Sequence, residues 1–197
     1  MTPTILILAA GSSSRMRGGD KLLEPVDGQP QLARLVRAAL ATGLPVAVTL
    51  SPDRPARAAC LDALPITRVI VPDAIEGMAA SLRAGIAALP HPAPVLVVLG
   101  DLPEITTDDL CRMTAAWATR PEALLRGSAQ DGTPGHPVGF PADLIAELST
   151  LSGDQGAREV IQRHRQRLVS VPLPGQHATT DLDTPEDWAR WRASRNS

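Results

Sequence analysis

The sequence predicts an α/β fold built on a mostly parallel sheet. Short runs of Val, Ile and Leu alternate along the chain with Ala/Leu/Arg-rich stretches of helical period, which is typical of repeated strand-helix units. The 197 residues fit one domain, residues 1–197, and a chain of this size buries roughly 70% of its unfolded surface. We find no linker long enough to separate two domains.

The elements follow in order from these runs. In the first half, apolar runs predict strands at residues 5–9, 45–50, 68–71 and 95–99, and apolar spacing predicts helices at residues 31–42, 55–64, 78–89 and 107–119. The second half predicts a strand at 123–128, a Gly/Pro-rich turn at 131–137, helices at 142–148 and 155–164, a strand at 167–172 and a helix at 185–195. Ligands of open parallel sheets bind beyond the carboxyl ends of strands, so we expect the loops after Ala9, Val71 and Leu99 to converge on one cleft.

Composition excludes several classes of function. The net charge of −2 leaves no broad basic face for nucleic acid, and the absence of Tyr argues against base-stacking platforms. Cys60 and Cys111 match neither a disulfide framework nor a zinc site, and the apolar run at residues 5–10 is too short for a signal peptide or membrane span. We therefore expect a cytoplasmic monomer that binds a small anionic ligand.

The segment LAAGSSSRMRGGDKLL, residues 8–23, has the order of parts that a polyphosphate site needs. A strand leads into Gly11, which allows a tight turn, and Arg15, Arg17 and Lys21 follow. It has neither the GxGxxG of dinucleotide folds nor the GxxxxGK[ST] of P-loop proteins, which disfavours hydride transfer and ATPase-type switching. The alternative is a surface turn with solvated cations.

Carboxylates follow a strand and precede the last helix. In VLVVLGDLP, residues 95–103, Asp101 ends a strand, where it could hold Mg²⁺ together with substrate phosphates or merely form a turn. In DLDTPED, residues 181–187, Thr184 is expected to cap a helix that begins at Pro185. Spacing alone leaves Asp181 and Asp183 open between structural and metal-binding roles.

Three further motifs have mainly structural explanations. EGMAASLRAGI, residues 76–86, is chiefly a core-facing helix, which leaves Gly77 and Ser81 free to meet a ribose or phosphate. GHPVGF and SGDQGAR, residues 135–140 and 152–158, are explained as loops, with Asp154 as a helix N-cap. Arg158 could face a second anionic substrate, whereas His136 is more often a satisfied loop residue than a ligand or base.

Together these motifs resemble the molybdenum cofactor nucleotidyltransferases, the molybdopterin cytidylyl- and guanylyltransferase family, over almost the whole chain. The matching pieces are LAAGSSSRM with Lys21, EGMAASLRAG, GDLP, GHPVGF, SGDQGAR and DLDTPED, in the order of the family. The first motif is shared more loosely with sugar-phosphate and isoprenoid-precursor nucleotidyltransferases, whereas GDQGAR points to the molybdopterin branch. The resemblance implies a three-layer α/β/α Rossmann-like fold related to nucleotide-diphospho-sugar transferases.

The resemblance also implies roles for individual residues. Asp101 would bind Mg²⁺, and Asp183, with Asp181 as its substitute, would complete the metal site. Gly77 and Ser81 would line the nucleoside, and the loops around His136 and from Asp154 to Arg158 would face the acceptor. The triphosphate would be held by the first loop, namely by Gly11, Arg15 and Lys21, with Ala9, Ala10 and Ser12 beside them.

The sequence departs from the family pattern at specific positions. Arg17 stands in RMRGGDK where the family usually reads RMG before the lysine, and Leu102 replaces the Met that follows the metal-binding Asp. The guanylyltransferases typically read LAGG, whereas this chain has Ala10 in that motif. With Ala10, this motif resembles that of the cytidylyl branch, and CTP is the expected nucleotide.

The implied reaction is Mg²⁺-dependent transfer of a nucleotide, CMP from CTP, to the phosphate of molybdopterin. Arg15 and Lys21 would stabilise the departing pyrophosphate, and no general base is needed because the acceptor phosphate is already ionised. One alternative is transfer to another phosphorylated metabolite, such as a sugar or alcohol phosphate. Another is a non-catalytic protein that carries the cofactor to a molybdoenzyme, against which the presence of both Asp101 and Lys21 argues.

Overall fold

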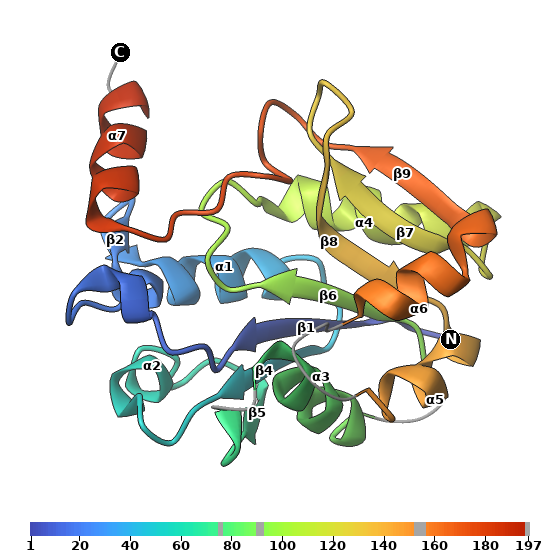
Figure 1. Ribbon diagram of the computed structural model, residues 1–197, viewed down its shortest axis with the longest axis horizontal. Helices are drawn as coiled ribbons and strands as arrows, with labels where there is room; N and C mark the ends of the chain where they lie inside the picture. Colours follow the sequence, from blue (N-terminus) through green and yellow to red (C-terminus); the bar gives the residue numbers. More distant parts are fainter. Residues whose placement is uncertain (75–76, 90–92, 152–156, 196–197) are drawn as a thin grey trace.

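A seven-stranded sheet forms the centre of the protein (Figure 1), with the strand order β5-β4-β1-β6-β8-β7-β9. The computed structural model describes all of the 197 residues except 75–76, 90–92, 152–156 and 196–197. Strand β8 runs antiparallel to β6 and β7, and the other pairings are parallel. The strands are β1 (Thr4–Ala9), β4 (Val46–Leu50), β5 (Thr67–Ile70), β6 (Val95–Leu99), β7 (Leu124–Ser128), β8 (Pro134–Phe140) and β9 (Leu168–Pro172).

Helices cover both faces of this sheet, because alternate residues of its buried strands point to opposite sides. Ile5 and Ile7 of β1 pack on one face with α1 (Gln31–Leu40), α4 (Thr107–Thr119) and the segment after α2 (Pro55–Ala59). Leu6 and Leu8 pack on the other face with α3 (Met78–Ala87), α5 (Ile145–Leu148) and α6 (Arg158–Arg163). The predicted three-layer α/β/α architecture is therefore confirmed.

The last helix, α7 (Pro185–Arg195), lies beside a small hairpin of β2 (Pro25–Val26) and β3 (Gln29–Pro30) (Figure 1). Its Trp188 and Trp191 rings meet edge to face, with centroids 5.7 Å apart, in a cluster with Met16 and Val26. The predicted helix start is confirmed, because the Thr184 amide donates to the Asp187 carboxylate at 3.0 Å and the Asp187 amide donates to the Thr184 hydroxyl at 3.2 Å.

One prediction of local structure is wrong, and one element of the structure was not predicted. Much of the turn expected at residues 131–137 belongs to β8, although Pro137 has no amide to donate; an irregularity of β7 opposite it, between Arg126 and Ser128, interrupts the ladder there. The β2–β3 hairpin was not expected, although an Asp-Gly pair is a strong hairpin signal; Asp27 and Gly28 both have positive φ, 50° and 79°.

Several helices are shorter than the sequence predicts. Helix α2 ends at Ala59, and the helix expected at residues 142–148 is a 3₁₀ turn, η4 (Ala142–Leu144), followed by α5. Two more 3₁₀ turns, η1 (Ser14–Met16) and η2 (Lys21–Leu23), lie in the segment after β1, and η5 (Arg165–Arg167) precedes β9. None of the helices among the described residues has the length and apolar character needed to cross a membrane.

Candidate functional site

A cavity of about 390 Å³ opens at the carboxyl ends of β1 and β6. Its wall consists of residues 8–15, Lys21, Leu22, Ala74, Gly77, Met78, Ser81, residues 99–101 and Asp183. The loops after β1, β5 and β6 therefore meet at one cleft, as the parallel arrangement of these strands predicts.

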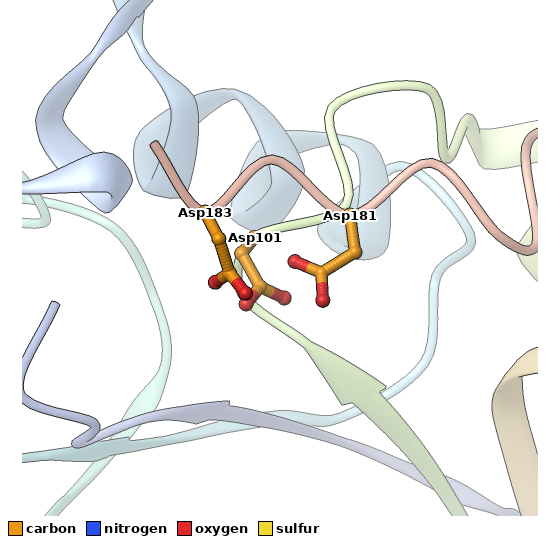
Figure 2. Close-up of side chains that lie close together, drawn as sticks. All are labelled: Asp101, Asp181 and Asp183. Carbon is orange, nitrogen blue, oxygen red and sulfur yellow. The ribbon is translucent and has the colours of Figure 1, made fainter. Parts of the chain in front are cut away.

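Three carboxylates from two distant segments meet beside this cavity (Figure 2). Asp101 follows β6, and Asp181 and Asp183 precede α7; one oxygen from each lies within 4.8 Å of the others. Oδ1 of Asp101 is buried and has no hydrogen-bond partner among the described residues. A buried carboxylate oxygen without a donor, next to two more carboxylates, fits a divalent cation, because such ions prefer oxygen ligands.

Lys21 lies among the same carboxylates. Its ammonium contacts Asp101 and Asp183, and a carboxylate oxygen of Asp181 is 3.7 Å away. Burial opposes the charge of Lys21, but the Asp101 and Asp183 carboxylates outweigh that effect and raise its pKa. The ammonium therefore stays protonated among these carboxylates.

The two flanking aspartates differ in their electrostatics. Burial and the Asp101 carboxylate raise the pKa of Asp181 to about 6, against the effect of Lys21. Burial acts in the same direction on Asp183, but hydrogen bonds from Lys21 and Arg15 outweigh it and lower the pKa of that carboxyl. Asp183 is consequently ionised at neutral pH, and a cation beside Asp181 has to compete with a proton in mildly acidic solution.

The three cations of the first loop take different positions. Lys21 is inside the cavity wall, and Arg15, whose side chain is 70% exposed, reaches Asp183 at its rim. Arg17 points elsewhere: it pairs with Glu186 of α7 at 2.8 Å and does not line the cavity. The sequence leaves the role of Arg17 open; in the structure, its backbone has a left-handed φ of 50° after η1, and its side chain is engaged with α7.

The residues predicted to line the nucleoside also lie in the wall of this cavity. Gly77, with φ of 92°, precedes α3, and Ser81 is 5% exposed one turn into that helix. Ala10 is buried against Val71 and Ala80 at the same end of the sheet. Ala9, Gly11 and Ser12 complete this side of the cavity.

His136 and Arg158, two of the residues expected to face the acceptor, do not line this cavity. His136 lies in β8, where burial lowers its pKa to about 4 and its Nδ1 has no partner among the described residues, so it is not the satisfied loop residue that its motif indicates. Arg158 is exposed at the start of α6. Asp154, with most of the SGDQGAR motif, lies outside the described residues.

Sequence reasoning missed the side chains that hold these loops in place. Glu104 accepts a hydrogen bond from the Thr180 hydroxyl at 2.8 Å and another from the Trp191 indole at 2.9 Å, which ties the segment of Asp181 and Asp183 to the segment of Asp101. Arg57 of α2 is fully buried against the loop after β1. No local motif marks either residue, because each acts on a segment distant in sequence.

Solved structures share this fold. The chain superposes on a nucleotidyl transferase from Methanothermobacter with a TM-score of 0.80, covering 100% of this chain and 99% of that one; at 21% identity this shows the fold. Rv0371c from Mycobacterium tuberculosis H37Rv superposes with a TM-score of 0.84 at 28% identity over 96% of each chain. The two structures share the architecture of this chain over nearly its whole length.

The sequence places the chain more narrowly: it belongs to the family of the MobA-like NTP transferase domain, which matches residues 5–168. Two curated relatives are similar over nearly their full length. One is nicotine blue oxidoreductase of Paenarthrobacter nicotinovorans, 28% identical over 95% of both chains. The other is molybdenum cofactor guanylyltransferase of Bradyrhizobium sp. (strain ORS 278), 29% identical over 93% of this chain and 89% of that protein.

Proposed function

We propose that this protein transfers a nucleotide, CMP from CTP, onto the phosphate of molybdopterin in a Mg²⁺-dependent reaction. The observation that carries the proposal is the juxtaposition of Lys21 with Asp101, Asp181 and Asp183 at the mouth of a cavity lined by a glycine-serine loop. Transfer from a metal-bound polyphosphate needs carboxylates that hold the metal ion and a cation that stabilises the leaving group, and these side chains provide both. The relatives add support. One is named a molybdenum cofactor guanylyltransferase, and a crystal structure of Rv0371c has been solved in complex with manganese.

In this proposal Asp101 and Asp183, with Asp181, hold the metal ion, which when bound would neutralise charge on the transferring phosphoryl group. Lys21 and Arg15 exchange their carboxylate partners for oxygens of the β- and γ-phosphates when the nucleotide enters. An oxygen of the acceptor phosphate forms a bond to the α-phosphorus as the bond to the bridging oxygen breaks, and pyrophosphate leaves with that electron pair. No side chain needs to remove a proton, because the acceptor phosphate is ionised at neutral pH.

The choice of CTP rests on Ala10. Its methyl group packs against Val71 and Ala80 at the end of the sheet, beside Gly77 and Ser81, which we assign to the nucleoside. We infer that alanine in place of glycine at this position favours the smaller pyrimidine over a purine. We assign His136 and Arg158, with Asp154, to the acceptor side. The cytoplasmic location, the monomeric state and the organisation of residues 1–197 as one domain stay predictions from the sequence.

The experiment that tests this function measures pyrophosphate release with CTP, GTP or ATP, each with and without molybdopterin. We expect release with CTP and Mg²⁺ only when molybdopterin is present, and its loss in the Asp101→Ala variant. Exposed Asp108 of α4 offers a matched control, and Asp108→Ala is expected to keep wild-type turnover.

The possible outcomes separate the alternatives. Release with a sugar or alcohol phosphate in place of molybdopterin would move the proposal to another acceptor. Tight molybdopterin binding without pyrophosphate release from any nucleotide would indicate a carrier for a molybdoenzyme. Full turnover in Asp101→Ala would refute the metal assignment.

A further inference from the structure

The side chain of Arg57 is charged yet fully buried, at 0% exposure. It projects from α2, a short helix after β4, into the loop that follows β1. Burying a guanidinium costs free energy unless its donors are satisfied, so its contacts identify what the residue does.

Arg57 makes hydrogen bonds to several residues of the segment that runs from the end of β1 to Asp20. Its Nη1 donates to the carbonyls of Ala9 and Gly11, both at 2.7 Å, and its Nη2 donates to the Ser13 hydroxyl at 2.8 Å. Its Nε and Nη2 also form a two-point ion pair with Asp20, at 2.7 and 2.9 Å. One side chain thus holds the end of β1, the middle of the loop and the residue immediately before Lys21.

These contacts decide which way the loop amides point. In a trans peptide the carbonyl of one residue and the N–H of the next point to opposite sides. With the carbonyls of Ala9 and Gly11 turned onto Arg57, the N–H groups of Ala10 and Ser12 are directed away from it. Residues 9–13 also line the cavity, so these amides become available to a ligand there.

Asp20 completes the arrangement on the far side of the loop. Its carboxylate accepts from the Leu22 amide at 3.1 Å, which caps η2, the 3₁₀ turn that begins with Lys21. The Ser13 hydroxyl also donates to it at 3.3 Å. Asp20 therefore couples the orientation of the amide loop to the position of the lysine in the cavity.

We propose that Arg57 and Asp20 are positioning residues for nucleotide binding: their buried ion pair holds the loop amides and Lys21 in the geometry that accepts a triphosphate. The inference rests on the proposed nucleotidyl transfer and adds a mechanism for its nucleotide affinity. Arginine is required because a lysine ammonium cannot bind a carboxylate at two points and also donate to two carbonyls and a hydroxyl.

The test compares Arg57→Lys and Asp20→Asn with the wild-type protein. We expect each variant to raise the Kd for CTP with Mg²⁺ by roughly tenfold or more, the loss expected when a charge-assisted hydrogen bond is removed, as measured by titration calorimetry. The KM for CTP should rise similarly while the KM for the acceptor stays unchanged. A general loss of folding would not produce this separation.

Arg68→Lys is the matched control. Arg68 also pairs with an aspartate, Asp62, at 2.9 Å and donates to a carbonyl, that of Leu61, at 2.7 Å, but it lies outside the cavity wall. We expect this variant to keep the wild-type Kd for CTP. Hydrogen exchange gives a readout without nucleotide: Arg57→Lys should speed exchange in residues 9–13 and leave α4 unchanged.

Each outcome is decisive. A folded Arg57→Lys variant with wild-type CTP affinity and wild-type exchange in residues 9–13 would overturn the inference. If the wild-type protein binds no nucleotide, the proposed function fails and the nucleotide role of Arg57 fails with it; faster exchange in the variant would then establish loop ordering alone. Should Arg57→Lys not fold, Asp20→Asn carries the same comparison.

Discussion

Replacing Asp181 with asparagine is expected to stabilise the metal-free protein above about pH 6. In the folded protein, burial and the Asp101 carboxylate raise the pKa of Asp181 from 3.8 to about 6. The folded state therefore binds this proton more tightly than the unfolded chain does. The stability that the proton contributes is complete below about pH 4 and is lost as the pH rises through about 6. Asparagine has no such loss.

The magnitude follows from the shift of the pKa and from exposure. Raising a pKa from 3.8 to about 6 corresponds to roughly 3 kcal/mol for a fully buried group. The Asp181 side chain is 48% exposed, so solvent screening reduces this to about 1 kcal/mol. For a chain of this size, about 1 kcal/mol shifts the melting temperature by roughly 2–4 °C.

The assay is thermal unfolding between pH 4 and 8 in the presence of a chelator. The Tm of Asp181→Asn should match that of the wild type near pH 4 and exceed it increasingly up to about pH 6. Asp187→Asn is a control for which we expect the opposite change in stability. Hydrogen bonds with Thr184 lower the pKa of Asp187, so loss of this carboxylate should destabilise the protein above about pH 4. A Tm difference for Asp181→Asn that does not change with pH, or a less stable variant at pH 7.5, would refute the reasoning.

Further predictions concern the nucleotide, the base and the metal. Lys21→Ala should lower kcat for pyrophosphate release by about a hundredfold or more, because it removes a cation from the leaving group; wild-type kinetics would assign that charge to Arg15. Ala10→Gly should raise the kcat/KM ratio of GTP to CTP by about tenfold, and an unchanged ratio would remove Ala10 as the determinant of the base. Glu104→Ala should weaken Mn²⁺ binding by about tenfold, measured by titration, because Thr180 and Trp191 lose the carboxylate that ties the segment of Asp181 to the segment of Asp101; an unchanged Kd would contradict this role.

The periodicity of the sequence predicted most of the fold. Buried parallel strands such as 95–99 are short apolar runs that stand out between amphipathic helices, and each was found within a residue or two. Strand β8 was not predicted, because the glycines and prolines in its sequence are typical of loops. The irregularity that accommodates Pro137 lies in the partner strand β7, so the sequence of β8 does not reveal it.

The candidate site was predictable where it depends on strand ends. Asp101 and the loop of Gly11 follow parallel neighbours β6 and β1, so the topology brings them together. Lys21 was expected in the same site, but its pairing with Asp183, 162 residues away, depends on how the segment before α7 crosses the cavity mouth. Arg17 shows the opposite case, since only the course of the backbone after η1 reveals that it pairs with Glu186.

The sequence by itself determined the class of fold, the family and the edge of the sheet where the chemistry lies, because hydrophobic period and ordered motifs are properties of local segments. Only the tertiary structure decided which charges meet. Asp181 and Asp183 join Asp101 because Glu104 fastens their segment, and Arg57 reaches Asp20 across 37 residues because α2 packs beside the first loop. Such contacts depend on the packing of distant elements, which no local pattern encodes.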